Sequence, residues 1–303
     1  DNGQEFSGPT KVGRIEKLSL GMRRGPRIVV SNESIVISAI GHSSGNLVAW
    51  RSDDGGDSWS GPVQVNDVEK SAREGLHAMA CGPEGLLFCT WLDLRSGGTE
   101  IYGSRSVDGG KTWASNSRVY RSPSGTVCEC CHPSVVIDRD QQIHVMWRNV
   151  LDGNRDMYLA TSDDRGDSFR TARKLGLGSW PLNACPMDGG ELAVSPEGDL
   201  ITIWRRNNQV FTAMLDQPAE IAIGLGEQPT VSATADGDYF AWLARRHGDL
   251  MLATPAHQKP EKVATEASDP DMATSPTGTG PVVIVWEQGQ KPNLSILSKT
   301  IVP

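Results

Sequence analysis

The sequence contains no run of 18 or more apolar residues, and it therefore predicts no transmembrane helix. No segment shows the apolar periodicity of a long amphipathic helix, which argues against a helical protein. Basic runs are also absent, and the formal net charge of the 303 residues is -8. A surface of this charge repels nucleic acid and anionic membranes, so both are excluded as partners. No signal peptide is visible from Asp1 onward, although a mature chain would already have lost one.

Glycine, tryptophan and cysteine stand out among the residues that are present. The chain has 33 Gly and nine Trp within a hydrophobic content of 38%, which indicates an all-β protein with many turns. Six Cys is an even number that permits three disulfides. Disulfides persist in oxidising compartments, so the expected location is secreted or periplasmic.

One eight-residue pattern, S-x-D-x-G-x-[ST]-[WF], occurs three times. Its copies begin at Ser52, Ser106 and Ser162, which are 54 and 56 residues apart. A period of about fifty residues is typical of one four-stranded propeller blade. Within the pattern, Asp accepts hydrogen bonds from its own turn, and Gly adopts a backbone conformation that other residues resist. We interpret each octet as a structural hairpin turn.

A short apolar strand that usually ends in Trp gives the number of blades. Its six copies are Ile35–Ile40, Leu86–Trp91, Ile143–Trp147, Leu200–Trp204, Tyr239–Trp242 and Val282–Trp286. Gly- or Asp-rich turns precede the last five, as expected for hairpins. We therefore predict six blades in a single domain of residues 1–303. Residues 10–20 alternate like a lone strand, and they are expected to close the ring beside 293–301.

The octets resemble the Asp-boxes, or BNR repeats, of the sialidase superfamily. This resemblance implies a sialidase-like six-bladed β-propeller, with the boxes on the face away from the active site. In that family three arginines hold the substrate carboxylate, because guanidinium is a planar, permanently charged fork. Arg27 resembles the first arginine, although its proline lies before it, and Arg205 resembles the second. Either Arg245 or Arg246 is the candidate for the third.

The catalytic residues of that family have no matching counterparts in this sequence. Glu191 lies near the place of the family's glutamate, with a different spacing. The family's acid lies in a loop that corresponds to 41–46, which has no carboxylate here, and the last tyrosine, Tyr239, falls inside a predicted strand. A retaining glycosidase needs both a proton donor and a nucleophile. We therefore expect a degenerate catalytic set, with true exo-sialidase activity absent.

One face of the predicted propeller concentrates arginine, histidine and carboxylates. Strand directions alternate within a blade, so first-strand starts and second-strand ends share this face. The candidate ligand-binding residues there are Arg27, His77, His132, Arg148, Arg205, Arg245 and Arg246, and the candidate catalytic carboxylates are Asp93, Asp188, Glu191 and Glu287. Such a funnel predicts binding or processing of a carbohydrate or small anionic ligand. Solvated rim charges are the alternative for any single residue, and a non-catalytic interaction scaffold is the alternative for the whole.

Four of the six cysteines fall in two loops that lead into adjacent predicted blades. We predict a disulfide from Cys185 to Cys128, Cys130 or Cys131, with a second bond among the rest. The alternatives are a redox-active thiol pair and a soft-metal site for copper or zinc. The candidate metal ligands are Cys128, Cys130, Cys131, His132, Cys185 and Met187. No other cofactor is indicated.

The two remaining cysteines, Cys81 and Cys89, flank a hairpin turn. They either bond across neighbouring strands or pack as small hydrophobic thiols, and the sequence favours neither.

Without an acid and a tyrosine in register, the protein is expected not to hydrolyse a fluorogenic sialic acid substrate above background. Fluorescence release over time measures this directly. Robust hydrolysis that disappears in Arg205→Ala would contradict the expectation and restore the family activity.

Overall fold

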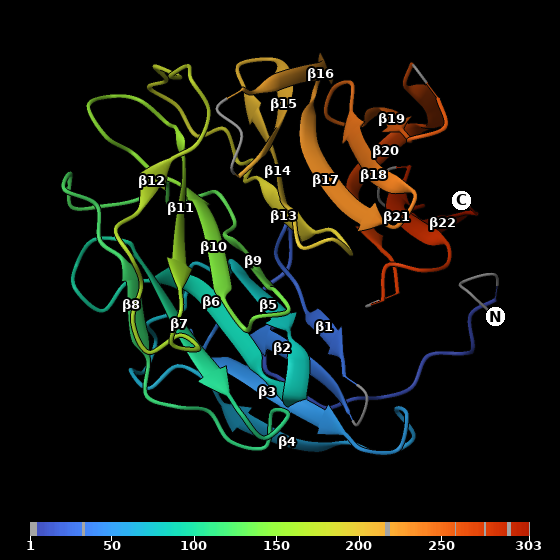
Figure 1. Ribbon diagram of the computed structural model, residues 1–303. Helices are drawn as coiled ribbons and strands as arrows, with labels where there is room; N and C mark the ends of the chain where they lie inside the picture. The colour runs from blue at the N-terminus through green and yellow to red at the C-terminus, as the bar shows by residue number, and fades with distance from the viewer. Residues whose placement is uncertain are drawn as a thin grey trace. The chain divides into compact units, whose positions relative to one another are not determined.

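The computed structural model describes residues 5–31, 34–215, 219–257, 259–275, 277–289 and 292–302. Regular structure within these residues is β throughout, apart from one 3₁₀ turn at Pro83–Gly85 (Figure 1). The strands form five antiparallel sheets, each built from strands that follow one another along the chain. This is the topology of β-propeller blades. No helix among the described residues is long and apolar enough to span a membrane.

The strands divide between two units, which we describe separately. The N-terminal unit is Pro9–Leu175 with Ser179–Gly189, and it holds three four-stranded sheets. Their strands are β1 (Arg27–Val30), β2 (Ile35–Ile40), β3 (Leu47–Ser52) and β4 (Ser60–Gln64); β5 (His77–Cys81), β6 (Leu87–Asp93), β7 (Glu100–Ser106) and β8 (Ser117–Tyr120); and β9 (Ser134–Ile137), β10 (Ile143–Arg148), β11 (Met157–Ser162) and β12 (Arg173–Lys174).

The core of the N-terminal unit lies between its sheets. Every residue of β6 is buried, because the strand is covered on both faces. Leu87 and Trp91 pack into a cluster with residues of the first sheet, whereas Phe88 and Leu92 pack into a cluster with residues of the third. Successive side chains of a strand point to opposite faces, so one strand contributes to two cores.

The C-terminal unit contains Gly190–Pro303 with Asp1–Gly8 and Gly176–Gly178. Its first sheet consists of β13 (Glu191–Val194), β14 (Leu200–Arg206), β15 (Gln209–Met214) and β16 (Ile221–Leu225), and its second sheet of β17 (Glu227–Thr234), β18 (Gly237–Leu243), β19 (Gly248–Ala253), β20 (Glu261–Ala273), β21 (Val282–Gln288) and β22 (Ser295–Ile301). The six predicted second strands, five of which were expected to end in Trp, are all formed, as β2, β6, β10, β14, β18 and β21.

The prediction of six separate blades is not confirmed, because β20 joins the last two sets of strands into one sheet. The first half of β20 pairs with β19 and its second half with β21. Glu266 and Asp269 within β20 have positive φ angles, and the register shifts beside them. Such bulges bend a strand. The two halves of the sheet also share one core, in which Tyr239 and Trp286 take part.

The strand expected over residues 10–20 is not formed. Leu18 alone pairs there, in an isolated antiparallel bridge with Gly41. Lys17 has a φ angle of 48°, a left-handed conformation that interrupts an extended chain. Sequence alternation in this segment therefore did not produce a strand.

The three octets fold into the same turn, placed between the third and fourth strands of each sheet in the N-terminal unit. In all three, the first-position serine donates to the third-position aspartate at 2.7 Å. The backbone amide of the fifth-position glycine donates to that serine at 2.7–2.8 Å. The aspartate also accepts the amide of the seventh position at 2.9 Å and its hydroxyl. Every glycine at the fifth position has a positive φ angle.

These hydrogen bonds favour the charged form of each aspartate. At Asp54 the bonds from Ser58 are the largest cause, and they lower the pKa to about 2. At Asp164 desolvation raises the pKa, but the bonds from Ser168 and Ser162 outweigh it and lower the value to about 2. The carboxylates therefore organise the turns as anions.

We expect Asp108→Ala to lower the free energy of unfolding by roughly 1–3 kcal/mol, because the substitution leaves the hydroxyl of Ser106 and the amide of Thr112 without their acceptor. Urea denaturation measures this, with Lys111→Ala on the exposed side of the same turn as the control. The pKa of Asp108 is lowered in the folded protein, so its contribution is full above the ordinary value of 3.8 and is lost as the pH falls below it. Equal stability of Asp108→Ala and wild type at pH 7 would contradict the structural role.

Candidate functional site

The three sheets of the N-terminal unit bring polar residues together where their first strands begin. Arg27 is the first residue of β1, His77 is the first residue of β5, and His132 lies two residues before β9. His77 is 1% exposed and His132 is 8% exposed. The Nε2 atom of His77 lies 3.0 Å from the hydroxyl of Ser38 on β2. Burying a histidine costs free energy, because its polar ring atoms lose their hydrogen bonds to water.

The electrostatics of both histidines indicate a positively charged site. Desolvation is the main cause that lowers the pKa of His77 well below its ordinary value, and the charge of Arg27 adds to it. Desolvation likewise lowers the pKa of His132, followed by the charges of Arg23, Arg27 and Arg148. Both imidazoles are therefore neutral at pH 7. Within the described residues, the Nδ1 atom of each histidine has no hydrogen-bond partner.

Backbone carbonyls hold the guanidinium groups of this site in place. Arg27 donates from Nη2 to the carbonyl of Arg23 at 2.6 Å and from Nη1 to that of Pro26 at 3.1 Å. Arg148 is buried and donates from Nε to the carbonyl of Asp188 at 3.0 Å, and its guanidinium lies 5.2 Å from the ring centre of Trp180. We call Arg23, Arg27, Arg148, His77 and His132 the arginine–histidine site.

The loop that contains Cys185 packs directly on this site. Gly189 lies against His132, and a Cβ atom added at Gly189 would overlap the His132 carbonyl oxygen and lie 2.7 Å from the ring Cε1. Asp188 beside it is buried, and its backbone carbonyl accepts a hydrogen bond from Arg148. Asp188 is thus the one candidate carboxylate that the N-terminal unit places at the arginine–histidine site.

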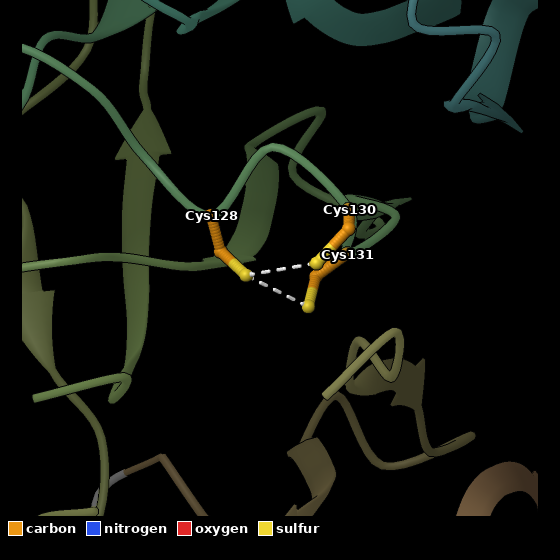
Figure 2. A group of neighbouring side chains, drawn as sticks. All are labelled: Cys128, Cys130 and Cys131. Atoms are coloured by element: carbon orange, nitrogen blue, oxygen red, sulfur yellow. Dashed lines mark hydrogen bonds between the residues drawn. The ribbon is translucent and has the colours of Figure 1, made fainter. Parts of the chain in front are cut away.

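The predicted disulfide from Cys185 is confirmed, with Cys130 as its partner. The second bond expected among the remaining cysteines of the cluster is not formed, because Cys128 and Cys131 are thiols. Next to it, Sγ of Cys128 points toward the other two sulfurs of the cluster, at 3.0 Å from Sγ of Cys131 and 3.7 Å from Sγ of Cys130 (Figure 2). Arg155 donates from Nη1 to the same Sγ at 3.1 Å. The hydrogen bond from Cys131, assisted by the charges of Arg148 and Arg155, lowers the pKa of Cys128 to about 6 despite its burial. Burial raises the pKa of Cys131.

The same cluster contains three of the six candidate metal ligands as one group. The sulfurs of Cys128, Cys130 and Cys131 lie within 4.8 Å of one another, and His132 is not part of this group. Since Cys130 is bonded to Cys185, only two of the three sulfurs are thiols. Cys81 and Cys89, which lie outside this cluster in the sequence, do not form a disulfide.

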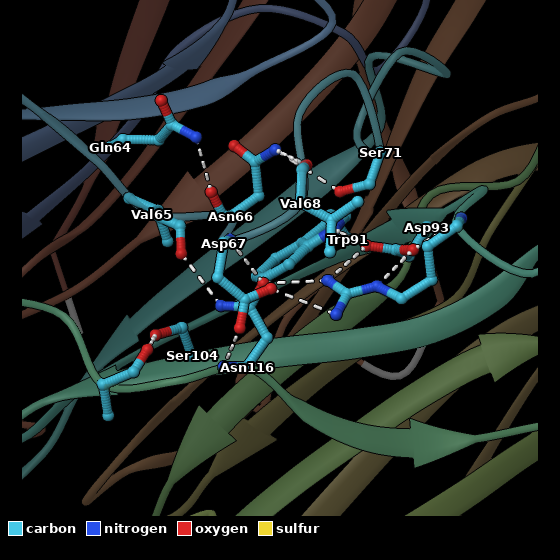
Figure 3. A network of polar contacts seen from close by, with 12 residues as sticks. Gln64, Val65, Asn66, Asp67, Val68, Ser71, Trp91, Asp93, Ser104 and Asn116 are labelled. Atoms are coloured by element: carbon cyan, nitrogen blue, oxygen red, sulfur yellow. Dashed lines mark hydrogen bonds and ion pairs between the residues drawn. The ribbon is translucent and has the colours of Figure 1, made fainter.

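Asp93, a candidate catalytic residue, lies in a structural network instead (Figure 3). It is fully buried at the end of β6, where Oδ2 accepts the indole N–H of Trp91 at 2.8 Å. Its two oxygens also accept Nε and Nη2 of Arg95, at 2.9 and 3.0 Å. Nη1 of Arg95 forms an ion pair with Oδ1 of Asp67 at 3.0 Å, and Nη2 of Arg95 donates to Oδ1 of Asn116 at 2.9 Å. Both oxygens of Asp93 are therefore used to join neighbouring loops.

The remaining candidates belong to the C-terminal unit. Arg205 forms an ion pair with Glu227 at 2.7 Å, and Glu191 accepts the amide of Val231 at 2.8 Å. Glu287 lies within β21, opposite Ser268 and Ile296. Arg245 and Arg246 are exposed between β18 and β19. Fixed partners within the unit thus occupy Arg205 and Glu191.

Sequence reasoning missed two residues of this region, Arg23 and Arg155. Arg23 lies four residues before Arg27 in the loop that leads into β1, so its proximity was a usable signal. Arg155 follows β10 by several residues, and no motif marks it. Its contact with Cys128 arises only from folding.

Comparison with known proteins identifies the fold. No protein-family model matches the sequence, and no curated protein does. Solved structures match over nearly the whole chain. They include an α-L-arabinanase from Penicillium chrysogenum, with a TM-score of 0.62, 12% identity, and 96% of this chain and 99% of that chain covered. An α-L-arabinofuranosidase from Fusarium graminearum matches with a TM-score of 0.61 and 12% identity, and the match covers 95% of this chain and 97% of that chain. An intramolecular trans-sialidase from Ruminococcus gnavus matches with a TM-score of 0.57 and 12% identity, and the match covers 92% of this chain and 94% of that chain. The chain therefore has the β-propeller fold of sialidase-type and arabinanase-type structures.

We expect Cys185→Ser to lower the free energy of unfolding by up to about 4 kcal/mol, because the bond closes a loop with a sequence separation of 55 residues. Urea denaturation without reductant measures this. Cys81→Ser removes a half-buried thiol that is not bonded, and it is the matched control. If both variants unfold at the wild-type midpoint, the disulfide does not stabilise the protein.

Proposed function

We propose that this propeller binds a carbohydrate, or a related small ligand, through an anionic group held at the arginine–histidine site. The observation that carries the proposal is that Arg23, Arg27 and Arg148 all lie close enough to act on the buried, neutral His132. Concentrated positive charge beside desolvated groups favours an anion, since the attraction is stronger where water is excluded. The similar solved structures, whose titles name an arabinanase, an arabinofuranosidase and a trans-sialidase, support a glycan as the ligand class.

The residue types suit an acidic sugar. Guanidinium groups bind carboxylates through two parallel hydrogen bonds. A neutral imidazole offers one donor and one acceptor, which matches a sugar hydroxyl. The Nδ1 atoms of His77 and His132 supply such groups inside the site. A carboxylate and a hydroxyl on one small ring would use both kinds of group together.

The proposed activity is binding, and catalysis is not part of it. Asp188 is the one candidate carboxylate that the N-terminal unit places at the site, whereas a glycosidase of the two-carboxylate type needs a pair. Asp93 and Glu191 already have partners in the folded protein. The proposal therefore assigns Asp188 to the positioning of Arg148.

The same proposal includes a finer fold assignment: one sialidase-like domain of six blades, with three Asp-boxes and an exported location. The shared core between the two halves of the sheet at β20 supports a fifth and a sixth blade. The identical hydrogen bonds of the octets support their assignment as Asp-boxes. The Cys130–Cys185 bond supports an oxidising compartment, secreted or periplasmic.

Isothermal titration with N-acetylneuraminic acid, galacturonic acid, galactose and arabinose tests the proposal. An acidic sugar is expected to bind and its neutral counterpart is not. Arg27→Ala is expected to weaken binding about tenfold or more, which corresponds to about 1.4 kcal/mol. Arg139→Ala removes an exposed arginine from the turn between β9 and β10, and it is expected to bind like wild type. Equal binding of acidic and neutral sugars, or no effect of Arg27→Ala, would overturn the proposal.

A further inference from the structure

The four clustered cysteines occupy two different environments. Cys128 and Cys131 are 0% and 1% exposed, and both are thiols. Cys130 is half-buried and Cys185 is exposed, and these two form the disulfide. A buried dithiol therefore lies directly behind a disulfide that reaches the surface.

The distances within the cluster suit exchange between the two pairs. Sγ of Cys128 lies 3.7 Å from Sγ of Cys130, which is one half of the disulfide (Figure 2). Sγ of Cys128 also lies 3.0 Å from Sγ of Cys131, so a bond of about 2.05 Å requires an approach of only ~1 Å. Cys128 and Cys131 have the C-x-x-C spacing found in thiol–disulfide oxidoreductases. One sulfur thus has two potential bonding partners.

Arg155 provides the charge that exchange requires. The thiolate is the nucleophile in thiol–disulfide chemistry, and a neighbouring cation favours it. Arg155 donates from Nη1 to Sγ of Cys128 at 3.1 Å. It is held against the segment before Cys185, because its Nε donates to the carbonyl of Leu182 at 3.2 Å and its amide to that of Trp180 at 2.8 Å. The same side chain therefore contacts the attacking sulfur and the loop that carries the leaving sulfur.

We propose that the four cysteines form an internal thiol–disulfide relay, in which one disulfide moves between the surface pair Cys130/Cys185 and the buried pair Cys128/Cys131. In the first step the Cys128 thiolate attacks Sγ of Cys130. The Cys128–Cys130 bond forms, the Cys130–Cys185 bond breaks, and Cys185 leaves as a thiolate.

In the second step Cys131 transfers its proton through solvent to the Cys185 thiolate and attacks Sγ of Cys128. The Cys128–Cys131 bond forms, the Cys128–Cys130 bond breaks, and Cys130 leaves as a thiolate. One thiolate, one thiol and one disulfide are present before and after, so no electrons enter or leave. The product carries a dithiol at the surface in place of a buried one.

Alkylation of the native, unreduced wild-type protein with iodoacetamide, followed by peptide mapping without reduction, tests the relay. We expect Cys185 to take up the reagent with time, while Cys128 and Cys131 are recovered as a joined pair. A static disulfide predicts the opposite, because Cys185 would stay bonded and unlabelled. The half-buried thiol of Cys81 serves as an internal clock. If Cys185 is still unlabelled after Cys81 has reacted completely, the relay is absent.

Single substitutions separate the two steps. Cys128→Ser removes the attacking sulfur and is expected to abolish labelling of Cys185. Cys131→Ser allows the first step alone, so a Cys128–Cys130 bond should accumulate with Cys185 labelled. Cys89→Ser removes a buried thiol elsewhere and should leave the wild-type pattern. Labelling of Cys185 at the wild-type rate in Cys128→Ser would overturn the relay. The wild-type map decides the question even where a variant fails to fold.

Metal analysis of the same sample provides a further decision. Copper and zinc are expected to be substoichiometric. Stoichiometric metal, together with labelling of all four cysteines once a chelator is added, would overturn the relay and assign the cluster to a soft metal.

Discussion

The burial of both faces of β6 and β10 is the constraint on which the N-terminal unit depends. In β6 alternate side chains enter two different cores, with Trp91 on one side and Phe88 on the other. A shift of one residue would exchange the two sets and leave neither core filled, so the register is strongly specified. The same registers set where each first strand begins. The polar residues of the arginine–histidine site are held together for this reason.

Polar groups inside such a structure need partners, and the chain supplies them in different ways at different places. The octet turns use an aspartate anion that accepts several local hydrogen bonds. Asp93 uses an arginine and a tryptophan. At the arginine–histidine site the balance differs, because His77 and His132 are kept neutral beside positive charge. That difference separates a structural polar network from a site suited to a ligand.

The cysteine cluster and the arginine–histidine site are built by the same two loops. His132 directly follows Cys131, and Gly189 of the Cys185 loop packs on the ring of His132. The Cys130–Cys185 bond therefore restrains the loop that packs against His132, in addition to joining the two chain segments. Arg148 belongs to both regions, since its charge acts on His132 and on Cys128.

Local features were predictable from the sequence, because they depend on neighbouring residues. The octet turns, the six second strands and a disulfide from Cys185 to the cluster follow from short motifs and spacing. Residues 10–20 show the limit of this reasoning, since alternation there meets a left-handed residue and forms no strand. Tertiary structure alone decided that Cys130 is the bonded partner, that Asp93 serves a network, and that Arg155 reaches Cys128. Each of these depends on distances between segments remote in sequence, which only the packing of strands and loops sets.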